Sequence, residues 1–190
     1  MNLSLILASK SPRRKSLLEQ LGYPFTCVSA DIDESILTAE TAENYVLRVA
    51  IAKAQAVALQ NATAVVLGAD TSVVVDGEIL TKPLDFADSK RMLTLLSGRK
   101  HQVLTALAVV YNQQVSSIVV SSEVFFKPLS DTEMNNYWHS GEPQDKAGSY
   151  AIQGLAGKFV THINGSYSAV VGLPLYETDQ LLAKYSFVKI

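Results

Sequence analysis

Short apolar runs alternate with stretches of helical periodicity through the first half of the chain, and this alternation constrains the fold most. Residues 3–8 and 25–30 are apolar runs of strand length. Between them, Ser11 and Pro12 are residue types preferred at a helix cap and at the first helical position, and we expect this helix to end at Gly22. Strand–helix–strand units form parallel sheets covered by helices, so this half predicts an α/β fold.

The rest of the pattern adds further helices and then strands joined by tight turns. Helices are expected near residues 41–60, 86–97 and 130–139, with a last one starting at Pro174. Strands are expected over an apolar run that ends at Asp70 and Thr71, and near residues 72–75, 78–81, 103–111, 115–126, 159–163 and 168–171. Because early strands alternate with helices and later ones form hairpins, the chain predicts a mixed twisted sheet with flanking helices.

The composition excludes several classes of protein. With 48% hydrophobic and 18% charged residues, the 190-residue chain suits a folded core, and we expect one domain over residues 1–190 with two lobes and no separate linker. A net charge of −2 argues against a nucleic-acid partner, so any anion site is local. No apolar run approaches the ~20 residues of a membrane span, and the start does not resemble a signal peptide. The single Cys27 excludes an internal disulfide, so a cytoplasmic protein is expected.

Three short polar clusters follow the first three predicted strands: "SKSPRR", "DIDES" and "ADT". In α/β sheets, ligands bind beyond the carboxyl ends of the strands. The first cluster places Arg13 and Arg14 at a helix N-terminus, where the helix dipole disfavours cations. A bound polyphosphate would reverse that cost, because backbone N–H groups and guanidinium groups both donate to phosphate. The alternative is a solvated basic first turn.

The acidic residues of these clusters are candidates for binding a metal ion. Asp31, Asp33, Glu34 and Asp70 offer the hard oxygen ligands that Mg²⁺ and Mn²⁺ prefer beside phosphates. The alternative is that each is an ordinary surface acid of a loop. Asp70 differs from the others because it follows an apolar run, and we expect it to be partly buried.

Two lysines are candidates for binding phosphate. Lys53 interrupts an apolar helical stripe formed by Val46, Val49, Ala50 and Val57. A lysine in such a stripe either extends to the surface or points its charge into a polar site, and the pattern alone allows both. Lys82, which precedes Pro83, is the second candidate, and its alternative is a turn lysine without a role in binding.

An ordered set of motifs covering nearly the whole chain resembles the Maf family, the septum-formation-inhibitor-like nucleotide pyrophosphatases. The motifs are "LILASKSPRRKSLLEQLG", "IDES", "KA" at Lys53, "LGADT", "GEILTKP", "SGEPQDKAGSYAIQG" and "NGSYSAVVGLPL". The resemblance implies a two-lobed α/β fold with a deep cleft, similar to inosine-triphosphate pyrophosphatases. It also implies hydrolysis of nucleoside triphosphates to the monophosphate and diphosphate with a divalent metal cation.

The resemblance further implies a substrate. One branch of the family carries SPRR, ADT and IQG and is associated with dTTP and UTP, whereas a second carries SPWR, SDQ and SEG and is associated with 7-methyl-GTP. Arg13, Thr71 and Gln153 match the first branch. The chain is therefore expected to be a dTTP/UTP pyrophosphatase with a house-cleaning role and a family-level link to cell division arrest. The alternatives are a pyrophosphatase for 7-methyl-GTP or other modified nucleotides, and a non-catalytic nucleotide-binding regulator of septum formation.

The matched positions carry over a set of roles from the family. Asp70 is expected to be the proton acceptor that activates water, with Lys53 and Lys82 as further catalytic residues. Glu34 and Asp70 are expected to hold the metal, whose identity (Mg or Mn) stays open. Substrate binding and base specificity fall to Ser9, Ser11, Arg13, Arg14, Thr71 and Gln153. A homodimer is a family-level expectation.

Overall fold

The computed structural model describes residues 3–187, and these divide into two compact units. Unit 1 comprises residues 3–70, 105–120 and 172–187, and unit 2 comprises residues 71–104 and 121–171. The strands pair in the order β2-β1-β3-β5-β6-β7, with β4 paired to β3. Parallel and antiparallel pairs both occur, which confirms the predicted α/β fold with a mixed sheet.

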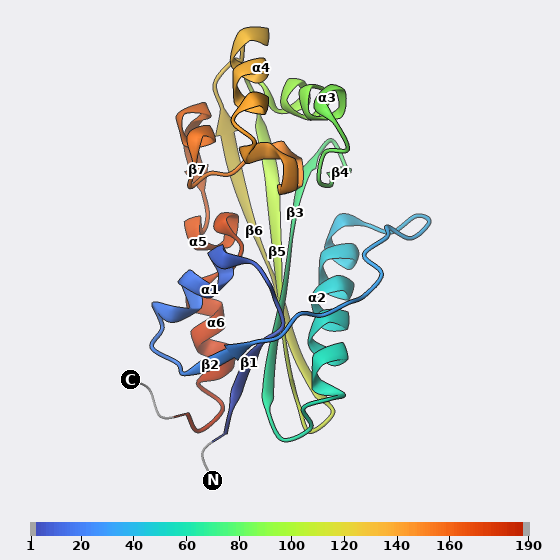
Figure 1. Cartoon of the computed structure of the whole chain (residues 1–190), viewed down its shortest axis with the longest axis vertical. Helices are drawn as coiled ribbons and strands as arrows, with labels where there is room; N and C mark the ends of the chain where they lie inside the picture. Colours follow the sequence, from blue (N-terminus) through green and yellow to red (C-terminus); the bar gives the residue numbers. More distant parts are fainter. Residues whose placement is uncertain (1–2, 188–190) are drawn as a thin grey trace. The chain divides into compact units, whose positions relative to one another are not determined.

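Unit 1 contains the parallel strands and the helices that follow them. Its elements are β1 (Leu5–Leu7), α1 (Pro12–Glu19), β2 (Phe25–Cys27), α2 (Ala42–Ala58), the first part of β3 (Val65–Val75) and α6 (Leu175–Leu182). β1 pairs in parallel with both β2 and β3. Within this unit α2 lies on one side of these strands, while α1 and α6 lie on the other (Figure 1). Strands buried on both faces read as continuous apolar runs, which explains why β1 was predictable.

Unit 2 contains hairpin strands and a series of short helices. Its elements are the rest of β3, β4 (Glu78–Leu80), α3 (Phe86–Leu96), α4 (Asp131–His139), three 3₁₀ segments η1 (Glu142–Asp145), η2 (Ala147–Ser149) and η3 (Leu155–Phe159), β7 (Val160–Asn164) and α5 (Tyr167–Val171). Its core includes Met92, Leu96, Phe126, Tyr137 and Phe159. The long strands β5 (Lys100–Tyr111) and β6 (Gln114–Phe126) contribute residues to both units.

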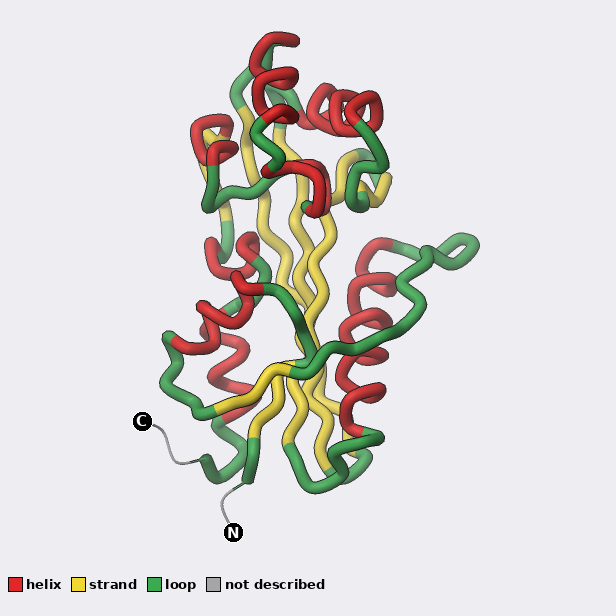
Figure 2. The backbone as a smooth tube through the Cα atoms, viewed as in Figure 1, coloured by secondary structure: helices red, strands yellow, loops and turns green. Residues whose placement is uncertain are grey.

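Two local predictions were wrong. β3 does not end at Asp70 and Thr71 but continues to Val75 as one strand, which Figure 2 traces without interruption. No Gly or Pro follows Gly68 within the strand, and the β-branched residues 73–75 are buried, so nothing stops its extension. Residues 168–171 were predicted as a strand, yet they belong to the helix α5, because Ser166 caps its first turn by accepting from the Ala169 N–H at 3.2 Å.

The β3–β4 hairpin and the α4 helix form as predicted. Asp76 and Gly77 both have positive φ, 51° and 82°, as a two-residue hairpin turn of type I′ requires. At α4, Ser130 and Glu133 form a reciprocal capping box. Within residues 3–187, no helix combines the length and the apolar character needed to cross a membrane.

Candidate active site

A buried lysine joins two carboxylates in unit 1. The Lys53 ammonium donates to Asp70 Oδ1 at 2.8 Å and forms an ion pair with Glu34 Oε1 at 3.1 Å. The Asp70 side chain is 10% exposed and the Glu34 side chain 44% exposed. Lys53 therefore does not extend to the surface. Its charge points into a polar site, which settles the alternative that the sequence left open.

A glycine lets α2 approach β3 closely enough for this contact. A Cβ atom at Gly68 would lie 2.4 Å from the carbonyl oxygen of Ala50 and 2.9 Å from the Cβ atom of Ala54. Real Cβ atoms do not approach so closely, so only glycine fits here. Asp70 lies two residues after Gly68 and so shares its face of the strand. Lys53 lies on the same part of α2 as Ala50 and Ala54, so the close approach brings it to Asp70.

The basic turn before α1 contributes a further cation to this cluster. Ser11 accepts from the Arg14 N–H at 3.4 Å, as a helix N-cap does, and Ser9 Oγ accepts from the Ser11 N–H at 3.1 Å. The Arg14 Nε donates to the carbonyl oxygen of Gly172 at 2.9 Å. Burial lowers the Arg14 pKa, and the charges of Asp70 and Glu34 oppose this effect. Arg14 thus lies within electrostatic reach of both carboxylates. Within residues 3–187, the neighbouring Arg13 takes part in none of the ion pairs.

Burial also sets the protonation chemistry of Asp70. Loss of hydration raises its pKa, while the positive charges of Lys53 and Arg14 act in the opposite direction. A carboxylate with a raised pKa is a stronger base than one exposed to water. The site therefore combines a buried base with two neighbouring cations.

The donor set of the cluster fits a divalent metal ion that shares its shell with phosphate and water. Glu34 and Asp70 each use one carboxylate oxygen for Lys53, and each has a second oxygen. Magnesium is commonly held by one or two carboxylates together with substrate phosphates and water. Glu34 and Asp70 would supply two ligands, and phosphate and water the rest. Among the described residues, no group of three or more His, Cys, Asp and Glu is placed to hold a metal.

Two residues that sequence reasoning missed hold the acidic loop in place. The Tyr45 hydroxyl donates to the backbone carbonyl of Glu34 at 3.0 Å, and burial raises the Tyr45 pKa to about 12. Arg48 binds Glu40 through two nitrogens at 2.6 and 2.8 Å and donates to the Ser35 carbonyl at 2.9 Å. Tyr45 stands two i, i+4 steps before Lys53 on α2, and that spacing was the signal that could have found it.

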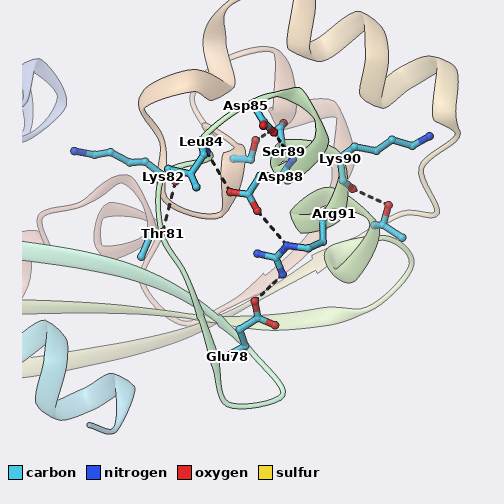
Figure 3. A network of polar contacts seen from close by, with 11 residues as sticks. Glu78, Thr81, Lys82, Leu84, Asp85, Asp88, Ser89, Lys90 and Arg91 are labelled. Atoms are coloured by element: carbon cyan, nitrogen blue, oxygen red, sulfur yellow. Dashed lines mark hydrogen bonds and ion pairs between the residues drawn. The ribbon is translucent and has the colours of Figure 1, made fainter. Parts of the chain in front are cut away.

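The other three predicted site residues belong to unit 2. Thr71 follows Asp70 on β3 and, by strand alternation, points to the opposite face. Lys82 is exposed in the loop between β4 and α3, and Figure 3 shows its side chain pointing away from the nearby charged network. In that network, Arg91 binds Glu78 at 2.6 Å and Asp88 at 3.1 Å. Gln153 is exposed in the segment before η3.

The structure thus brings together four of the predicted residues, Glu34, Lys53, Asp70 and Arg14, within unit 1. Ser9 and Ser11 build the turn that leads into Arg14. The acids Asp31 and Asp33 take no part in the Lys53 ion pairs, and Asp33 instead accepts from the Ser35 N–H at 2.8 Å. The chemistry available to this group is electrostatic stabilisation of an anion and removal of a proton beside it.

Comparison with known proteins gives matches over nearly the whole chain. Residues 4–185 match the family described as Maf-like protein. A "dTTP/UTP pyrophosphatase" of Vibrio parahaemolyticus is 60% identical over 185 residues, covering 97% of this chain and 98% of the relative. A protein of the same name from Pseudoalteromonas atlantica is 58% identical over 188 residues, covering 96% and 97%. The solved Ham1 protein of Staphylococcus aureus aligns with 65% of this chain and 71% of its own at 16% identity and a TM-score of 0.46.

Proposed function

The chain belongs to the Maf-like family, and from this premise we propose that it is a dTTP/UTP pyrophosphatase. The reaction hydrolyses dTTP or UTP to the nucleoside monophosphate and diphosphate. Relatives that carry this name are about 60% identical over nearly their full length. The observation that carries the proposal is the buried Lys53–Asp70 pair, with Glu34 and Arg14 beside it. A buried carboxylate next to two cations is an arrangement suited to proton removal beside a phosphate.

In the proposed reaction, Asp70 takes a proton from the water that attacks the α-phosphorus. A new bond forms between that water oxygen and the α-phosphorus, the bond to the bridging oxygen of the β-phosphate breaks, and diphosphate leaves. Lys53 holds the Asp70 carboxylate in place and contributes positive charge near the phosphates. Preorganised positive charge lowers the barrier most when it meets charge that develops during the reaction.

Further groups are proposed to bind the triphosphate. Arg13 and Arg14 extend from the first turn of α1, where backbone N–H groups also favour anions. Lys82, which belongs to unit 2, is also proposed to bind the phosphates. Glu34 and Asp70 would hold a divalent metal ion, which when bound supplies charge neutralisation and orientation of the phosphates.

Base recognition is proposed to depend on Arg13, Thr71 and Gln153. The support is the match of these three positions to the branch associated with dTTP and UTP. A site built to hydrogen-bond one base rejects another strongly, because mismatched buried polar groups stay unpaired. The resemblance to the family, rather than this selectivity, is the basis on which we propose a biological role in removing unwanted nucleotides from the pool.

The proposal is tested by a substrate panel on the purified protein with Mg²⁺ or Mn²⁺. We expect diphosphate release from dTTP and UTP at rates at least about tenfold above those with 7-methyl-GTP, since each tenfold needs only about 1.4 kcal/mol of selective binding. A preference for 7-methyl-GTP would overturn the substrate, and nucleotide binding without any turnover would favour a regulator of septum formation instead.

A further inference from the structure

A carboxylate of η1 binds the segment that carries Gln153. The Glu142 Oε2 atom accepts from the Leu155 N–H at 2.9 Å, and its Oε1 atom accepts from the Ala156 N–H at 3.4 Å. These N–H groups open η3, whose N-cap position is Gly154 and has no side chain to cap them. Glu142 therefore accepts the hydrogen bonds of these N–H groups, a role that the side chain of a serine or aspartate at the N-cap position usually has.

The other end of the same segment is anchored through Tyr137. The Tyr137 hydroxyl donates to Glu142 Oε1 at 2.7 Å and accepts from the Ala151 N–H at 3.1 Å. Between the two anchors, the Gly154 N–H donates to the Ala151 carbonyl at 3.0 Å, which closes a turn with Gln153 at its third position. We call residues 151–156 the Gln153 turn. Glu142 and Tyr137 thus hold both ends of the Gln153 turn, while Gln153 itself is exposed.

The lack of a side chain at Gly154 leaves room for the same contact. A Cβ atom at Gly154 would lie 2.1 Å from Glu142 Oε2, closer than any side chain allows. The carboxylate therefore sits directly against the backbone of the residue that follows Gln153. Tyr137 and Ala156 are 3% and 0% exposed, so a lost partner there would leave buried polar groups unsatisfied.

We infer that Glu142 is a positioning residue for base recognition: it holds the Gln153 turn so that Gln153 is already in place when the nucleotide binds. This inference rests on the proposed function, in which Gln153 contacts the base. Glu142 does not touch the reacting phosphorus in this account, so its loss acts on substrate binding. A contact that is already ordered loses less conformational entropy when the substrate binds. The effect of this preorganisation is therefore expected on KM rather than on kcat.

The test compares Glu142→Ala with a matched control in the same unit. Glu142→Ala is expected to raise KM for dTTP about tenfold and to leave kcat within about twofold, the size of effect of a lost charged hydrogen-bond network. The control is Glu133→Ala, because Glu133 also caps a helix, accepting from the Ser130 N–H at 3.0 Å, but has no contact with the Gln153 turn. Its KM is expected to equal that of the wild type.

A double variant separates positioning from a general structural role. If Glu142 acts through Gln153, then adding Glu142→Ala to Gln153→Ala changes KM by less than about twofold, because coupled residues are not additive. A full tenfold effect in both backgrounds would overturn the inference, as would an unchanged KM in Glu142→Ala alone.

Amide hydrogen exchange at Leu155 and Ala156 reports the contact itself without any substrate. Faster exchange is expected in Glu142→Ala and not in Glu133→Ala, and unchanged exchange would overturn the anchoring role. Wild-type protein that hydrolyses neither dTTP nor UTP would contradict the proposed function, whereas wild-type turnover with an unaffected Glu142→Ala variant would contradict this inference alone.

Discussion

At the scale of single residues, the Lys53 ammonium offsets the cost of burying a carboxylate in the middle of a strand. Desolvation favours the neutral form of Asp70, and an ammonium at 2.8 Å favours the charged form. Glu34 shares that ammonium at 3.1 Å, so one cation serves two acids. Removing one member of such a buried pair leaves an uncompensated charge. Lys53, Asp70 and Glu34 are therefore best regarded as one charged cluster.

His101 in unit 2 makes the stability of the protein depend on pH. It is 3% exposed, its Nε2 atom lies 2.8 Å from the Tyr150 hydroxyl, and its Nδ1 atom has no partner among the described residues. Burial lowers its pKa to about 4, whereas the unfolded chain titrates near 6.5. Between these two pKa values the unfolded state therefore binds more protons than the folded state. The contribution of His101 to the free energy of unfolding is fully present above about pH 6.5 and falls as the pH approaches 4.

The pH prediction is checked by urea unfolding of the wild type and His101→Gln at pH 7 and pH 4. From this residue we expect the wild type to lose about 3 kcal/mol of unfolding free energy, and His101→Gln to lose correspondingly less. His139→Gln, at an exposed histidine, provides the control and should follow the wild type. Equal pH dependence in His101→Gln and the wild type would rule out this origin.

At the scale of elements, the contact between α2 and β3 determines the site. Lys53 and Asp70 come from different elements, and they meet because Gly68 presents no side chain to Ala50 and Ala54. The sequence indicated that Lys53 interrupts an apolar stripe, but could not identify its partner, since a stripe position does not specify which strand lies opposite. Strand boundaries were likewise uncertain, because a buried polar residue such as Asp70 resembles a strand end when its partner is unknown.

Gly68→Ala is predicted to weaken both the fold and the activity. The new Cβ atom would meet backbone 2.4 Å away, so α2 must shift, which costs about 1–3 kcal/mol and moves Lys53 from Asp70. Urea unfolding and dTTP turnover measure the two effects. Gly77→Ala is the control: its φ of 82° also costs stability, yet the turn is outside the Lys53 group. Turnover of dTTP by Gly68→Ala at the Gly77→Ala rate would show that the close contact between α2 and β3 does not determine the site.

At the scale of the whole molecule, each of the two compact units contains some of the candidate residues. Glu34, Lys53, Asp70 and Arg14 belong to unit 1, whereas Thr71, Lys82 and Gln153 belong to unit 2.

The alternation of strands and helices was enough to predict a mixed α/β sheet, because strands that are buried on both faces appear in the sequence as continuous apolar runs. The family motifs identified site residues whose common role could not be inferred from their spacing in the sequence. The single domain with a deep cleft, the metal and the homodimer stay predictions.

The central claim is that Asp70 is the base of a pyrophosphatase, and Asp70→Asn tests it most directly. Asparagine keeps the shape but cannot accept the proton, so we expect dTTP turnover to fall at least about 100-fold while calorimetry shows nucleotide binding retained. The control is Asp76→Asn at the hairpin turn, where Asp76 binds Arg99 at 2.6 Å and turnover should be unchanged. Turnover by Asp70→Asn at the wild-type rate would contradict the account.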